Sequence, residues 1–220
     1  MGKVMRIVWR IVWLGAVLLM AALVDSESLR GQGCGFLFDE QGTFLCRVDA
    51  PEAAGYVFML REGQRPLVAR LADPVHDPET IGAETRVVCA SKEYILSCLK
   101  RSRAYRWNHH GAILGTLFMW KESGYGGTLD FAVNSLYDIT DNILYITESH
   151  RDGAIAHNRF NFGNFLWGAA AQATGLPCFF AKLGSHVNAF LFSQDGRGRR
   201  GQFDTPDDIL SINAGYAWSR

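Results

Sequence analysis

The sequence has no excess of charge of either sign. It carries 22 lysine and arginine residues against 22 aspartate and glutamate residues, so its formal net charge is zero with neutral histidines. A basic excess is typical of proteins that bind nucleic acid over a broad surface, so this balance counts against that class. A nuclease that works with a local basic strip is still allowed. Arg197, Arg199 and Arg200 form one such run, which suits a solvated loop or a contact with phosphate or anionic cell wall.

The sequence also lacks internal repeats and any Cys-x-x-Cys pair, so we expect no structural zinc site among its five cysteines. Cys34 and Cys46 flank a predicted hairpin, and in an exported chain they are the best candidates for a disulfide. Cys89 and Cys98 fall on one predicted helix, roughly 13 Å apart along its axis, which is too far for a bond.

A clean cleavage motif is missing after the N-terminal segment. Lys3, Arg6 and Arg10 precede residues 11–24, an uninterrupted run of apolar residues and glycine. The run is short for a membrane-spanning helix and typical of a signal peptide. We therefore predict that residues 1–26 are a signal peptide or an uncleaved N-terminal membrane anchor. Either one predicts export to the periplasm or beyond, with the inner membrane as a partner if the segment remains.

Apolar alternation predicts strands in the first third of the chain. Residues 36–38 and 43–48 form a hairpin around a four-residue turn, and residues 56–60 and 66–71 form a second pair. Further predicted elements are a helix from residue 78 to about residue 106, a helix at 112–121, a strand at 143–147, a helix at 165–174 and a closing helix that begins at 205–206.

These elements predict an α+β fold of 220 residues, and a hydrophobic content of 48% is sufficient for a core. Residues 30–75 form short β-hairpins that pack on the main domain. Residues 76–220 form that domain, which is predicted to be mainly helical.

Three sequence blocks carry chemistry in a fixed order. Residues 118–131 hold an aromatic stretch, a glycine turn and Leu-Asp-Phe; residues 161–168 read Asn-Phe-Gly-Asn-Phe-Leu-Trp-Gly; and residues 204–208 read Asp-Thr-Pro-Asp-Asp. Together they resemble the bacterial polymorphic toxin type 44 family over about residues 118–218, under half the chain. Two positions depart from the family pattern: Ala132 stands where the family usually has lysine, and Ile209 where it usually has glutamine. A catalytic lysine at position 132 is therefore absent.

The central block predicts a helix start. Asn164 is a plausible N-cap, and Gly163 suggests backbone that an ordinary side chain would strain. Gly175 and Pro177 end the helix.

Three residues are catalytic candidates. Glu122 closes an apolar helix, where a carboxylic acid of raised pKa acts as a general acid on a glycosidic bond, unless it is a plain surface residue. Asp130 is a general base or positions a nucleophile, unless it caps the following turn. His157 serves as acid or base near neutral pH, unless it belongs to a polar loop.

Substrate-binding candidates come from the later blocks: Asn161, Gly163, Asn164, Asp207 and Asp208. With Asp204, the two aspartates suit acid/base work or a divalent cation, or alternatively the N-terminal capping of a helix. No spacing demonstrates a metal site, so we expect no cofactor, with a divalent cation as the alternative.

Three functions remain open on the sequence. The first is an exported toxin-like effector hydrolase of bacterial competition, which acts on peptidoglycan or another envelope polymer and is paired with a cognate immunity protein. The second is a nuclease effector, which the family resemblance implies and which would act on RNA or DNA. The third is a non-catalytic envelope protein that retains the toxin-like fold, as the alanine at position 132 allows.

Overall fold

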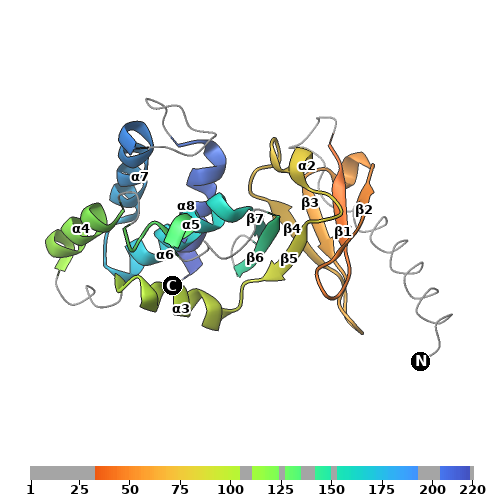
Figure 1. The fold of residues 1–220 in the computed structure, drawn as a ribbon, viewed down its shortest axis with the longest axis horizontal. Coiled ribbons are helices and arrows are strands. Elements are labelled where there is room, and N and C mark those ends of the chain that lie inside the picture. The colour runs from red at the N-terminus through yellow and green to blue at the C-terminus, as the bar shows by residue number, and fades with distance from the viewer. Residues whose placement is uncertain are drawn as a thin grey trace.

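The protein has an α+β fold, in which the strands gather at one side and helices α3 to α8 at the other (Figure 1). The computed structural model describes residues 33–104, 111–123, 127–134, 142–149, 153–192 and 204–218. The predicted targeting segment at residues 1–26 lies outside these ranges. No helix in the described ranges is long and apolar enough to cross a membrane.

Seven strands form one mixed sheet in the order β2-β1-β3-β4-β7-β6-β5. The strands are β1 (Gly35–Phe38), β2 (Phe44–Val48), β3 (Tyr56–Met59), β4 (Leu67–Leu71), β5 (Arg86–Cys89), β6 (Ile143–Ser149) and β7 (Gly153–His157). The antiparallel pairs β1–β2 and β3–β4 confirm the two predicted strand pairs. The strand predicted at 143–147 is confirmed as β6, whereas β7 lies in a segment that the sequence presented only as polar.

The sheet curls until its two edges almost meet. Thr43, just before β2, pairs with Arg86 of β5, and the Val87 N–H donates to the Gly42 carbonyl at 2.8 Å. The enclosed face carries a buried apolar cluster that includes Phe36, Phe38, Val57, Ala69, Leu71, Val87, Leu144, Ile146 and Ala156. Near-closure stabilises the sheet, because it leaves fewer unpaired backbone groups at the edges.

The predicted boundary at residue 75 runs through this sheet. β4 pairs in parallel with β7, so strands from residues 30–75 and from residues 76–220 share one ladder. The early hairpins are therefore part of a common sheet with the second half of the chain. The prediction of hairpins that pack on a mainly helical domain is not confirmed.

The long helix predicted from residue 78 to about residue 106 is wrong. The chain there forms α2 (Asp77–Thr80), the strand β5 and α3 (Lys92–Arg101). The neighbouring β-branched residues Val87 and Val88 favour a strand, and Val87 is buried in the sheet. Ser91 then starts α3 as its N-cap, accepting from the Tyr94 N–H.

The strand register also corrects the predicted disulfide. Cys34 and Cys46 are both free. Cys46 pairs with Leu37 across the β1–β2 ladder and packs with it on one face of the sheet. Because successive side chains alternate between faces, Cys34 points to the other face, where it joins the enclosed cluster with Phe36. The sheet itself separates the two sulfurs.

We expect mass mapping of the alkylated, unreduced protein to find no fragment pair that joins Cys34 to Cys46. The exposed Cys89 should react in the native chain, whereas the buried Cys34 should react only after unfolding. A fully reduced sample is the control. Recovery of a 34–46 bond would show that the β1–β2 register is different in solution.

Five further helices build the second half of the protein and contribute most of its core. They are α4 (Gly111–Glu122), α5 (Phe131–Asn134), α6 (Arg159–Ala173), α7 (Cys178–Phe192) and α8 (Pro206–Trp218). The helix predicted at 112–121 and the closing helix are confirmed. Most of α6 is buried, so this helix lies at the centre of the largest apolar cluster.

Helix α6 begins six residues before its predicted first residue. Asn158 is the N-cap and accepts from the Asn161 N–H at 2.9 Å, so Asn161, Gly163 and Asn164 all lie inside the helix. Gly163 does not relieve backbone strain. A Cβ at this position would lie 3.1 Å from the Ala132 Cβ, so the glycine allows α5 to approach α6.

Two glycines bring α6 and α8 into close contact. A Cβ on Gly168 would lie 2.1 Å from the Ile212 carbonyl oxygen, and a Cβ on Gly215 would lie 1.8 Å from the Phe165 carbonyl oxygen. Real Cβ atoms do not approach backbone oxygens so closely. The two helices therefore meet backbone to backbone, and each glycine is required by the other helix.

Gly168→Ala and Gly215→Ala should each lower the free energy of unfolding by about 1–3 kcal/mol or more, because the helices must separate to admit a methyl group. Chemical denaturation of the purified variants measures this change. Gly82→Ala is the matched control, since its added Cβ meets no atom within 4 Å; we expect it to change stability by less than about 0.5 kcal/mol. Wild-type stability of both helix variants would contradict the close contact.

Candidate functional site

Three asparagines on α6 each donate to an aspartate from another segment. They lie three residues apart, at 158, 161 and 164, and so share one side of the helix. Asn158 Nδ2 donates to Asp77 Oδ1 at 2.9 Å, Asn161 Nδ2 to Asp207 Oδ2 at 3.1 Å, and Asn164 Nδ2 to Asp208 Oδ1 at 2.6 Å. The structure thus brings together four of the predicted substrate-binding residues. We call the set from Asn161, Asn164, Asp207 and Asp208 the Asn–Asp cluster.

Asp208 also caps the start of α8. Its Oδ2 accepts from the Thr205 N–H at 3.1 Å and from the Thr205 hydroxyl at 2.7 Å. The carboxylate of the third helical residue thus reaches back to the N–H of the residue before the helix, which is one of the two hydrogen bonds of a capping box. The capping interpretation of the aspartates is therefore confirmed for Asp208.

The Asp208 carboxyl group has a pKa of about 6, raised from 3.8. Burial is the main cause, because it disfavours the charged form, and the negative charges of Asp207 and Asp204 act in the same direction. The hydrogen bonds from Thr205 oppose the shift. Thr205 and Pro206 are exposed beside it, so this protonatable carboxyl group lies close to the surface.

Helix α7 adds a histidine to the same region. His186 Nδ1 lies 3.7 Å from Asp204 Oδ2, with the histidine side chain 32% exposed and the aspartate 8% exposed. The sequence groups Asp204 with Asp207 and Asp208, whereas nothing in it joins His186 to them. Together with Asp207 and Asp208 they place three carboxyl groups and one imidazole around the start of α8.

His157 does not reach any surface. Its side chain is fully buried at the end of β7, with Thr147 Oγ1 at 3.0 Å from Nε2 and Ser211 Oγ at 3.0 Å from Nδ1. Burial lowers the pKa of the imidazole to about 3. A neutral ring with both nitrogens occupied cannot exchange protons with substrate, so the predicted role of His157 as acid or base is wrong.

Asp130 lies at the start of α5, and none of the hydrogen bonds described for the Asn–Asp cluster involves it. It directly precedes α5, its N–H donates to the Gly127 carbonyl at 3.1 Å, and α5 reaches α6 through Ala132 and Gly163. Gly163 is two residues from Asn161, and two residues along a helix point to nearly opposite sides. The sequence blocks also predict one cleft lined by Asp130, His157 and Asn164; because His157 is fully buried, it cannot line such a cleft.

Ala132 stands where the type 44 toxins usually have lysine, and its small side chain packs against α6. Ala132 fits against Gly163, and its carbonyl oxygen accepts from Arg159 Nε at 3.0 Å. Arg159 also lies over the Phe160 ring at 5.4 Å. A cation thus reaches this region from α6, although no pattern in the sequence identified it.

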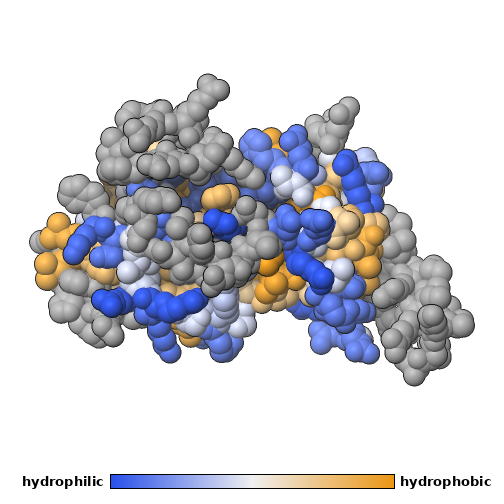
Figure 2. Space-filling model, in the orientation of Figure 1, coloured by the Kyte–Doolittle hydropathy of each residue, from blue (hydrophilic) through white to orange (hydrophobic). Residues whose placement is uncertain are grey.

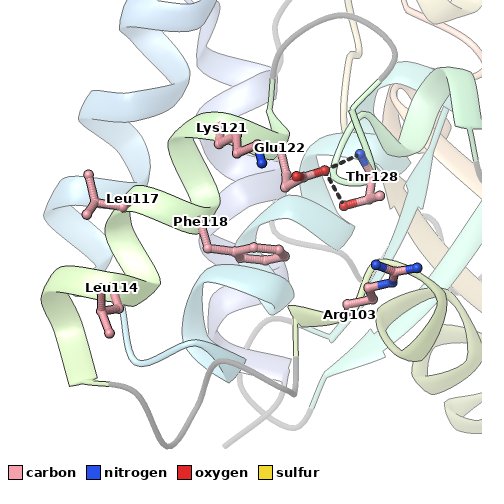
Figure 3. A pocket seen from close by; sticks show the side chains of 7 residues that line it. All are labelled: Arg103, Leu114, Leu117, Phe118, Lys121, Glu122 and Thr128. Carbon is pink, nitrogen blue, oxygen red and sulfur yellow. Dashed lines mark hydrogen bonds between the residues drawn. The ribbon is translucent and has the colours of Figure 1, made fainter.

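Glu122 has a different role from the predicted general acid. Its Oε2 accepts from the Thr128 hydroxyl at 2.9 Å and from the Thr128 N–H at 3.2 Å (Figure 3). These hydrogen bonds lower the pKa of the carboxyl group instead of raising it. Glu122 lines a cavity of about 350 Å³ with Arg103, Leu114, Leu117, Phe118, Lys121 and Thr128.

Within the described ranges, no group of three or more histidine, cysteine, aspartate and glutamate side chains is arranged to hold a metal ion. Comparison of the chain with protein-family models, with curated proteins and with solved structures finds no match.

The buried imidazole predicts loss of stability in acid. The folded-state pKa of about 3 lies below the ordinary value of 6.5, so the unfolded chain takes up the proton first. The contribution of His157 is fully present above about pH 6.5 and is lost as the pH falls toward 3, on the order of 5 kcal/mol over the whole window.

Urea unfolding from pH 7 to pH 4 measures this slope. His157→Gln should flatten it, since an amide keeps hydrogen-bonding capacity and cannot be protonated. The quantity to compare is the change in unfolding free energy with pH. The absolute stability of the variant also changes, because the substitution alters packing against Phe165. An unchanged slope in the variant would mean that another group controls the acid transition.

Proposed function

We propose that this chain is an exported effector hydrolase of the bacterial cell envelope that acts on peptidoglycan. Its acid/base pair is Asp208 and Asp207, in place of the three catalytic candidates expected from the sequence. Asn161 and Asn164 hold the two carboxyl groups through their amides.

The observation that supports this proposal is the environment of Asp208. A carboxyl group with a pKa of about 6 beside other carboxylates is suited to donate a proton at mildly acidic pH. The adjacent carboxyl group of Asp207, held by Asn161, is the proposed proton acceptor. Carboxyl groups with such divided roles are the usual machinery of glycoside hydrolysis.

Two features of the sequence support the location and the class. Residues 1–26 have the pattern of a signal peptide or membrane anchor, which would bring the folded part to the wall polymer. Residues 118–218, which include the Asn–Asp cluster, carry the resemblance to the type 44 toxins. An effector of this kind implies a cognate immunity protein as partner.

Inducible expression in a bacterial host tests the proposal. The full chain should cause lysis and release of soluble wall fragments, whereas a form that lacks residues 1–26 should not. Asp208→Asn should reduce lysis by at least about tenfold while the protein stays folded. Asparagine keeps the side-chain volume but has no carboxyl proton to donate. Hydrolysis of isolated peptidoglycan should decline as the pH rises through about 6, where Asp208 loses its proton.

Asp49→Asn is the matched control, since this exposed aspartate pairs with Arg47 and directly follows β2, away from the Asn–Asp cluster in the sequence. It should lyse cells like the wild type. Growth arrest by the form without residues 1–26, with loss of RNA or DNA, would sink the envelope assignment and favour a nuclease.

A non-catalytic envelope protein is the second candidate. It is favoured by the two hydrogen bonds from Thr205, which give Asp208 a sufficient structural role at the start of α8. Under this alternative Asp208→Asn would change only thermal stability, and neither the full chain nor the purified protein would degrade peptidoglycan.

A further inference from the structure

The cavity beside α4 is separate from the Asn–Asp cluster and combines two kinds of surface. Leu114 and Leu117 of α4 are 46% and 52% exposed, and hydrophobic atoms are visible over this helix in Figure 2. The other wall is polar and holds Arg103, Lys121 and the Glu122–Thr128 pair. A volume of about 350 Å³ is in the range of small-molecule sites.

Three distant segments build the polar wall. Thr128 Oγ1 donates to Glu122 Oε2, and it also lies 3.3 Å from the Ser102 carbonyl oxygen at the end of α3. Arg103 follows Ser102 directly. In Figure 3 the Phe118 ring points from α4 toward the side on which Arg103 lies, and both residues lie below the Glu122 carboxylate.

Arg103 has an unfavourable backbone conformation. Of the non-glycine residues that the structure describes, it alone has a positive φ, of 62°. It follows the C-cap of α3, a position where glycine is preferred because other residues are strained there. An arginine at this position lowers stability, so a role for its side chain is the simplest reason for its presence.

The described residues that line the cavity carry one more positive than negative charge. Glu122 is held by Thr128, while Arg103 and Lys121 are near enough to lower the pKa of Glu122 without an ion pair to it within the described chain. Two cations and one carboxylate give a net charge of +1. A ligand with one negative charge neutralises this charge, whereas a dianion such as a phosphate monoester would leave an excess negative charge.

We infer that this cavity binds a small monocarboxylate, whose carboxylate meets Arg103 and Lys121 and whose apolar body lies on Leu114 and Leu117. The planar guanidinium group of arginine suits a carboxylate through paired hydrogen bonds. Such a ligand has two natural sources, a fatty-acid-like chain or the C-terminus of a short peptide.

Calorimetric titration of the purified full chain with hexanoate tests the inference. Hexanamide has nearly the same shape without the charge, and acetate has the charge without the body. Hexanoate should bind about tenfold more tightly than either one, as expected when one charged hydrogen bond or the apolar contact is removed. N-acetyl-alanyl-alanine distinguishes the sources, because tighter binding than hexanoate indicates a peptide C-terminus and weaker binding a fatty-acid-like chain.

Arg103→Gly separates ligand binding from structure. It should weaken hexanoate binding about tenfold while the melting temperature stays the same or rises, because glycine relieves the strained backbone. Lys121→Gln should also weaken binding, and Arg70→Gln, at an exposed arginine of β4, is the control.

Equal affinity for hexanoate and hexanamide, wild-type binding by Arg103→Gly, or no binding of either carboxylate would overturn the inference. Asp208→Asn should bind hexanoate like the wild type. The proposals of a carboxylate site and of a hydrolase site can therefore be tested independently.

Discussion

The backbone contact between α6 and α8 is the constraint on which the rest of the second half depends. Gly168 and Gly215 leave no room for a side chain, so the helices are held at one separation and in one register. That register places Asn161 and Asn164 opposite Asp207 and Asp208. It also places Ser211 against His157, which joins α8 to the sheet. Packing and polar pairing therefore specify the same arrangement of the two helices.

Helix α6 then divides the molecule into separate chemical regions. Its asparagine side faces the aspartates at the start of α8, and its Gly163 side faces α5. The cavity near Arg103 and Glu122 lies at α4 and the end of α3. The cavity and the Asn–Asp cluster share no residue, so Glu122 and the two aspartates belong to different parts of the second half.

Local patterns were reliable where neighbouring residues decide the outcome. The two early strand pairs, β6 and the Pro206 start of α8 were predictable from alternation and from turn and capping residues. The failures occurred where distant contacts decide. Residues 86–89 became a strand because β6 offered a parallel partner. The Asn-Phe-Gly-Asn segment became helix because α5 and α8 cover it, and Asn158 supplied the N-cap that Asn164 was expected to provide.

The sequence by itself determined the α+β class and the residue types of the Asn–Asp cluster, because these depend on composition and local spacing. Only the tertiary structure decided which of the polar residues are accessible. His157 and Glu122 have suitable chemistry for catalysis, yet burial makes one unreactive and Thr128 keeps the other ionised. Solvation and hydrogen bonding set the pKa of a group, and both arise from segments distant in the chain.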